Sequence, residues 1–159
     1  MSRPLIIDIA VEGGEWPAET DLAGIVARAA DATIREVGQE PPEGCELSVL
    51  FTDDEYVASL NAQWRGKEGP TNVLSFPSGL PGSGDALPAM LGDIVLASET
   101  VRREAELESK PLEHHLTHLI VHGLLHLLGH DHEEEGEAEE MERLERLVLA
   151  RLAIGDPYV

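Results

Sequence analysis

The pattern of hydrophobic and polar positions divides the chain into short strand-like segments and longer helix-like segments. Four segments are rich in β-branched or aliphatic residues and are bounded by turn residues, which is typical of β-strands: 5–11, 46–51, 72–76 and 90–97. Five others carry apolar residues at intervals of three and four, which is typical of helices: 19–37, 53–62, 98–108, 112–128 and a last segment after residue 132. Thr52 and Glu55 match a capping box at the start of the second helix. These elements predict an α+β fold, an α/β layer with a mixed sheet of about four strands and about five helices.

The composition indicates one globular domain. The chain has 159 residues, of which 42% are hydrophobic, enough to form a core. The single cysteine, Cys45, cannot form an internal disulfide, which fits a reducing compartment. No run of about 18 apolar residues exists, and Asp8 and Glu12 interrupt the first apolar segment, unlike in a signal peptide. We therefore expect a cytoplasmic protein without a membrane span, formed by a single domain over residues 1–159.

The candidate chemistry lies in segment 112–132. Its apolar residues are too dense for a surface helix and predict a central buried one. His122 and His126 are four residues apart, so on a helix they share one face, with Cβ atoms about 5–6 Å apart. Gly129 can adopt a positive φ and end the helix, after which the chain can turn His132 toward the same point. Three imidazoles would then hold one zinc ion and leave a tetrahedral position open, as in catalytic zinc sites.

A histidine on an apolar helix is more often a core or surface residue than a ligand, and His114, His115 and His118 make this region rich in histidine. His118 would share a face with His122. However, residues 118 and 126 would lie about 12 Å apart along a helix, whereas a Zn–N bond is only about 2 Å long. His118 can therefore reach a neighbour of the site, but it cannot share one metal ion with both His122 and His126.

The spacing of the three histidines also occurs in the metzincin peptidases. In those enzymes a glutamate follows the first histidine and acts as the general base. Here that position is Gly123, which has no side chain. The pattern thus predicts a metal-assisted hydrolase but disfavours peptide hydrolysis.

The run from His122 to His132, HGLLHLLGHDH, resembles the signature of the YbeY family, H-G-x-L-H-L-x-G-Y-D-H, with His130 in the place of Tyr. Two further blocks are similar to family blocks. Trp64-Arg65-Gly66 with the segment PTNVLSFP (residues 70–77) matches an Arg followed by P-T-D-V-L-S-F-P, with Asn72 in the place of Asp, and the segment LGDI (residues 91–94) matches a strand of the family. The blocks cover about residues 45–150.

This resemblance implies a single-strand-specific, metal-dependent endoribonuclease that acts in ribosomal RNA processing, including maturation of the 16S rRNA 3′ end, and in ribosome quality control. It implies one zinc ion per chain, and single-stranded or ribosomal RNA and the small ribosomal subunit as partners, with no DNA. The alternatives are a non-catalytic ribosome-assembly or RNA-binding factor with a structural zinc, and a metzincin-like peptidase.

Five further residues are candidates for the site. The resemblance implies that Arg65 handles the substrate, and its planar guanidinium suits a phosphate, although a surface ion pair is the alternative. Asp93, in a strand expected to be buried, either orients a ligating histidine or accepts from backbone amides. Asp131 either adjoins the metal site or caps the turn. His130 could add a ligand, and Lys110 could contact substrate.

The net charge of −20 conflicts with RNA binding, because phosphate contacts usually need a basic surface. Part of the acidity is local, and these glutamates are expected to form a solvated face at the start of the last helix: Glu133, Glu134, Glu135, Glu137, Glu139, Glu140, Glu142 and Glu145. Five bases near the family blocks are candidates for a small basic cluster that contacts RNA: Arg65, Lys67, Arg102, Arg103 and Lys110. The sequence supports equally well that these bases are ordinary solvated residues.

Overall fold

The structure is a computed structural model that describes residues 5–78, 90–130, 135–155 and 158. Within these ranges the chain forms four strands and five helices, which confirms the predicted α+β fold with a mixed sheet. The elements follow in this order: β1 (Ile6–Val11), α1 (Glu19–Val37), β2 (Glu46–Thr52), α2 (Asp54–Arg65), β3 (Val73–Pro77), β4 (Met90–Ala97), α3 (Ser98–Leu107), α4 (Leu112–Leu127) and α5 (Glu135–Arg151).

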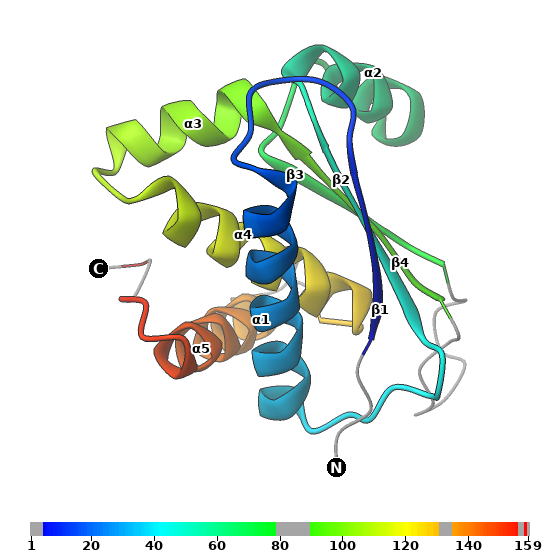
Figure 1. Cartoon of the computed structure of the whole chain (residues 1–159), viewed down its shortest axis with the longest axis vertical. Coiled ribbons are helices and arrows are strands. Elements are labelled where there is room, and N and C mark those ends of the chain that lie inside the picture. The colour runs from blue at the N-terminus through cyan, green and yellow to red at the C-terminus, as the bar shows by residue number, and fades with distance from the viewer. Residues whose placement is uncertain (1–4, 79–89, 131–134, 156–157, 159) are drawn as a thin grey trace.

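The strands form one sheet in the spatial order β1-β2-β4-β3 (Figure 1). β1 pairs in parallel with β2, and β2 pairs in parallel with β4, whereas β3 runs antiparallel to β4. A parallel pair needs a crossover connection, and α1 supplies the one between β1 and β2. β1 and β3 are the edge strands of this sheet.

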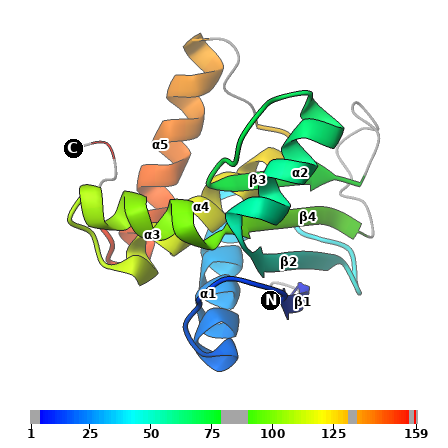
Figure 2. The same ribbon diagram turned by 90° about the horizontal axis from the view of Figure 1, so that it is seen from above.

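Most of the helical mass lies on one face of the sheet. Figures 1 and 2 show α1, α4 and α5 on the same side, and α4 contacts both β3 and β4. Ile94 and Leu96 of β4 share the main hydrophobic core with Leu116, Ile120 and Leu124 of α4. The candidate histidine helix is therefore fixed directly against the sheet.

Helix α2 covers part of the opposite face. Its Val57 belongs to a second cluster with Leu74 of β3 and Val95 of β4. Successive side chains of a strand point to opposite faces. β4 therefore directs Ile94 toward α4, and it directs Asp93 and Val95 toward the side of α2.

Helix α4 is buried, as its density of apolar residues predicts, and it ends in a Schellman motif. The backbone N–H of Gly129 donates to the carbonyl of His126, and the N–H of His130 donates to the carbonyl of Leu125. Each of these hydrogen bonds is 3.0 Å long. Gly129 adopts a φ of 100°, a conformation that a side chain would strain. The predicted helix stop at Gly129 is thus confirmed.

Two boundary predictions were wrong. The side chain of Asp53, not Thr52, accepts the capping bond from the N–H of Tyr56 at 2.9 Å, because Thr52 is still part of β2 and buried. Helix α2 also continues past its predicted end at residue 62 and ends at Arg65. Within the described residues, no helix is long and apolar enough to cross a membrane.

Candidate metal centre

His122 and His126 lie side by side on α4. Their ring centroids are 4.8 Å apart and their planes are inclined by 77°. Both side chains are partly exposed on a helix that is otherwise mostly buried, and that of His122 retains 26% of its accessible surface. The four-residue spacing thus produces the expected pair of neighbouring imidazoles that reach the surface.

The third predicted ligand, His132, and its neighbour Asp131 lie outside the described residues. Within the described residues no group of three or more side chains could hold a metal ion. The three-histidine ligand set therefore stays a prediction, and the structure tests only its first two members.

A buried carboxylate supports this pair from α5. Glu145 has no accessible surface, and its Oε1 lies 2.7 Å from Nδ1 of His122. His118 Nε2 lies 3.3 Å from the same oxygen, and the hydroxyl of Tyr158 donates to Oε2. His118 thus reaches a neighbour of the pair, as its position on the helix predicts.

Glu145 is ionised despite its burial. Burial by itself raises the pKa of this carboxyl, but the imidazoles of His118 and His122 and the hydroxyl of Tyr158 outweigh that effect and lower the pKa to about 2. A carboxylate without a proton only accepts hydrogen bonds, so Nδ1 of His122 carries the hydrogen.

The residues present fit a metal ion. With its proton on Nδ1, a neutral His122 has a lone pair on Nε2, the nitrogen that points away from Glu145. Ligating histidines are normally oriented in this way, by a carboxylate or carbonyl on the other ring nitrogen. Glu145 therefore has the position of such an orienting carboxylate relative to His122.

Glu145 was not among the predicted site residues and was expected on a solvated face of the last helix. That assignment was wrong for Glu145, although Glu137, Glu139 and Glu140 are indeed exposed. The signal was present in the helical spacing. Glu145 lies four residues after Met141 and four before Leu149, both of which are buried, so it shares their face.

The structure does not bring Asp93 to the histidine pair. Its side chain is exposed, which contradicts the expected burial, and it lies on the sheet face opposite α4. The histidine-orienting role considered for Asp93 therefore has its structural counterpart in Glu145.

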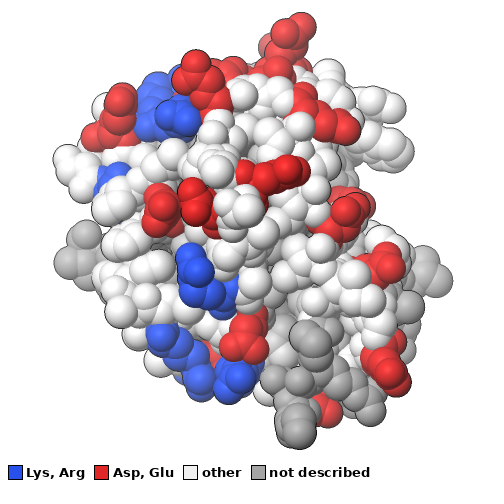
Figure 3. Space-filling view, viewed as in Figure 1, with Lys and Arg blue, Asp and Glu red and all other residues white. Residues whose placement is uncertain are grey.

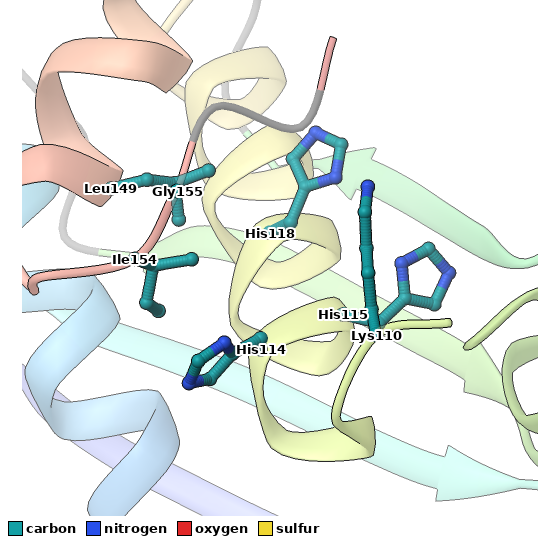
Figure 4. A pocket seen from close by; sticks show the side chains of 7 residues that line it. All are labelled: Lys110, His114, His115, His118, Leu149, Ile154 and Gly155. Atoms are coloured by element: carbon teal, nitrogen blue, oxygen red, sulfur yellow. The ribbon is translucent and has the colours of Figure 1, made fainter. Parts of the chain in front are cut away.

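Lys110 lies in the connection between α3 and α4, away from the histidine pair. It lines a cavity of about 170 Å³ together with His114, His115 and His118 (Figure 4). Lys110 extends between the rings of His115 and His118, while His114 points to the other side. Neither His122 nor His126 lines this cavity.

Arg65 and His130 occupy separate positions. Arg65 is exposed at the C-terminal end of α2 and makes no ion pair with another described residue. His130, directly after the Schellman glycine, is partly buried. Burial lowers the pKa of its imidazole, against the opposing charge of Glu140, and so favours the neutral ring. Neither placement tests the chemical role considered for the residue.

Comparisons with known proteins show the family to which the chain belongs. A family model described as "Endoribonuclease YbeY" matches residues 15–153. The chain belongs to the YbeY family. It is 57% identical to the Endoribonuclease YbeY of Chelativorans sp. (strain BNC1), over 99% of this chain and 95% of that protein. It is 52% identical to the Endoribonuclease YbeY of Sinorhizobium medicae (strain WSM419), over 97% of this chain and 95% of the relative.

A solved structure supports the fold. The solution structure of TM1509 from Thermotoga maritima matches with a TM-score of 0.57 at 24% identity, over 93% of this chain and 92% of that one. At this identity the match supports the shared fold alone.

The structure explains why position 72 is Asn, although the family block has Asp there. Its Nδ2 donates to Oε1 of Glu104 at 3.1 Å, and the same oxygen lies 2.9 Å from Nε2 of the buried His115. An aspartate at position 72 could not donate this bond and would add a second carboxylate beside Glu104. Asn72 therefore helps to fix the start of β3 against α3 and α4.

The surface does not form a broad basic face on the side shown in Figure 3, where Lys and Arg occur in small groups among Asp and Glu. Two members of the predicted basic cluster have other partners. Arg102 donates to the carbonyl of Glu15 at 2.9 Å, and Lys110 lies 3.5 Å from Glu108. Arg65 and Lys67 are exposed and have no ion-pair partner in the described part of the chain.

Proposed function

We propose that this chain is a metal-dependent endoribonuclease that cleaves single-stranded RNA during ribosomal RNA maturation. The observation that carries the proposal is the pair His122 and His126 with Glu145 behind it, in a chain that belongs to the YbeY family. The relatives named above are described as endoribonucleases.

His122 and His126, with His132 as the third ligand, would hold one zinc ion. Three neutral imidazoles suit zinc and leave one position open for catalysis. When bound, the ion supplies Lewis acidity and an activated water for phosphodiester hydrolysis. Glu145 holds the hydrogen of His122 on Nδ1 and keeps Nε2 available. Asp131 and His130 adjoin His132 and are candidates for orienting it.

Arg65 would bind the phosphate of the substrate. Its guanidinium forms a planar fork of donors that matches phosphate oxygens, and it can stabilise the negative charge that develops during cleavage. In a chain of net charge −20, an arginine without an ion-pair partner among the described residues is available for this role.

A peptidase of the metzincin type is disfavoured by the packing of Gly123 as well as by its missing side chain. A Cβ at this position would lie 3.3 Å from two side-chain atoms of Ile94, so position 123 faces the sheet. A glutamate here would be forced into the core and would not extend beside the two histidines.

Membership of the YbeY family supports a proposal for the cellular setting. We propose that the substrate is the 3′ end of 16S ribosomal RNA, that the small ribosomal subunit is the partner, and that the protein acts in the cytoplasm, where it also serves ribosome quality control. Cys45 is the single cysteine of the chain and cannot form an internal disulfide, which is consistent with this compartment.

The test is cleavage of an end-labelled single-stranded RNA by zinc-loaded protein. We expect cleavage that stops with a chelator, returns when zinc is restored, and falls by about 100-fold or more in Arg65→Ala, the scale of losing one electrostatic stabiliser. Arg28→Ala, which removes an exposed arginine of α1, is the matched control and should cleave normally. A zinc-loaded protein that never cuts RNA, alone or with small ribosomal subunits, would contradict the proposal.

A further inference from the structure

A groove of about 570 Å³ lies between α2 and the sheet, on the face opposite α4. Phe76 and Val95 of the sheet contribute to its lining, and α2 contributes Tyr56 and Trp64. Asp93 is the one charged side chain among the described residues that line it. The groove is thus mainly apolar, and the carboxylate of Asp93 is its one charged hydrogen-bond acceptor among the described residues.

The aromatic residues of the chain are concentrated here. The sequence contains only two Trp, two Tyr and two Phe, and three of these six residues line the groove. Trp64 is 64% exposed and Tyr56 is 45% exposed. By contrast, Trp16 packs edge-on against Phe51 and donates its N–H to the carbonyl of Gly13. Exposed rings in one groove offer flat surfaces on which another ring can stack.

Arg65 and Lys67, for which the described part of the chain provides no ion-pair partner, lie at the same end of α2 as Trp64. Arg65 follows Trp64 directly, and Lys67 follows the capping residue Gly66. The acids at the other end of α2 have structural roles, since Asp53 caps the helix and Asp54 accepts two bonds from Thr100. The C-terminal end of α2 therefore offers cationic donors to an anion, although the molecule as a whole is strongly acidic.

We propose that this groove binds a nucleotide of single-stranded RNA, with its base stacked on Trp64 and Tyr56 and its phosphate held by Lys67, next to Arg65, which the proposed function assigns to the phosphate that is cleaved. Stacking on aromatic side chains is the main way in which proteins hold unpaired bases, and it requires bases that are free of a duplex. Asp93 would accept a hydrogen bond from an amino group on the edge of the base. This inference rests on the proposed function and names where the substrate lies beyond the metal centre.

The position of β3 makes such a path possible. β3 is the edge strand, with α4 on one face and the groove on the other. A flexible single strand that crosses this edge can contact both faces, whereas a rigid duplex cannot bend around it. Arg65 and Lys67, which have no ion-pair partner among the described residues, lie next to exposed aromatic side chains. This combination favours RNA as the ligand, because a protein helix would need an apolar surface without adjacent cations.

The fluorescence of Trp64 provides a direct test of binding in the groove. In a Trp16→Phe background Trp64 is the sole tryptophan, and stacking of a base should quench its emission. We would titrate the zinc-loaded, full-length protein with a single-stranded RNA hexamer whose phosphorothioate linkages resist cleavage. We expect saturable quenching by the single strand and none by the same hexamer annealed to its complement.

Variants then measure affinity by anisotropy of the labelled hexamer. Trp64→Ala should weaken binding by about 5- to 150-fold, the loss that corresponds to one stacked base, while Trp64→Phe should retain most of the affinity because it keeps a ring. Leu107→Ala removes another exposed apolar side chain, 77% accessible at the end of α3, and should leave affinity unchanged. Because Trp64 is exposed, its removal should not disturb folding.

The outcomes separate this inference from the proposed function. Wild-type protein that cleaves RNA, with unquenched Trp64 and full affinity in Trp64→Ala, would overturn the groove as a nucleotide site and leave the endoribonuclease standing. Quenching and Trp64-dependent affinity in a protein that never cleaves would support the groove and contradict the endoribonuclease. No binding of the hexamer at all would overturn the inference and favour a protein as the occupant of the groove.

Discussion

Nδ1 of His122 lies 2.7 Å from Oε1 of Glu145, a carboxylate with no accessible surface on the last helix. The contact joins two segments that are 23 residues apart in the sequence. It fixes which nitrogen of His122 faces outward, and so it links the packing of α5 to the chemistry of α4.

Glu145→Gln should weaken zinc binding by about 10- to 100-fold, the usual effect of losing a carboxylate behind a ligating histidine. The amide keeps the shape of the side chain but removes the negative charge that contacts Nδ1 of His122. Competition with a chromogenic chelator measures the affinity. Glu139→Gln, at an exposed position of the same helix, is the control and should bind zinc like the wild type. Equal affinities in the two variants would show that Glu145 does not support the metal centre.

The stability of the metal-free protein should fall in acid through Glu145. The pKa of this carboxyl in the folded state, about 2, lies below its ordinary value of 4.5, so the folded state binds its proton less readily than the unfolded state. The resulting stabilisation, on the order of 3 kcal/mol, is complete above about pH 4.5 and is lost as the pH falls toward 2. Urea unfolding in the presence of a chelator measures it. Glu145→Gln should show a shallower decline between these pH values, and parallel profiles would refute the assignment.

Gly129→Ala should destabilise the protein by about 1–2 kcal/mol, because a Cβ is strained at positive φ. The Schellman motif also sets the direction in which the chain leaves α4 toward His132. We therefore expect lower zinc affinity as well as a lower melting temperature. Gly136→Ala, in the first turn of α5 with open space around the position, controls for adding a methyl group and should not lower zinc affinity. Unchanged stability and unchanged zinc affinity in Gly129→Ala would count against this role.

Asn72→Asp should destabilise the protein by about 1–3 kcal/mol, because it replaces a donor to Glu104 with a second carboxylate. A second change, Glu104→Gln, restores a donor–acceptor pair and should recover part of the loss. Chemical denaturation of the two single variants and the double variant gives the coupling between the positions. Additive losses would mean that the contact does not stabilise the fold.

The sequence alone predicted the elements well and the supporting contacts poorly. Apolar periodicity located every strand and helix, because burial of one face governs both kinds of element. The spacing of His122 and His126 predicted their closeness, because that distance is set within a single helix. The capping residue of α2 was misassigned because Thr52 and Asp53 both suit an N-cap, and only the end of β2 decides between them.

Periodicity and spacing within single elements could not predict the contacts between elements that are distant in the sequence. Asp93 looked buried because the residues around it are apolar, but the uncovered part of the second sheet face leaves it exposed. Glu145 looked solvated because it follows many other glutamates, yet the packing of α5 on α4 buries it against His122. Asn72 differs from the Asp of the family block because it donates to Glu104, which lies 32 residues later in the sequence.

The most direct test of the central claim is a titration of metal-free protein with zinc while cleavage of a single-stranded RNA is followed. The account predicts that the cleavage rate rises with zinc and saturates at about one ion per chain, and that His126→Ala neither retains zinc at this site nor cleaves. Full cleavage by protein stripped of metal, or zinc content in His126→Ala equal to that of the wild type, would contradict it.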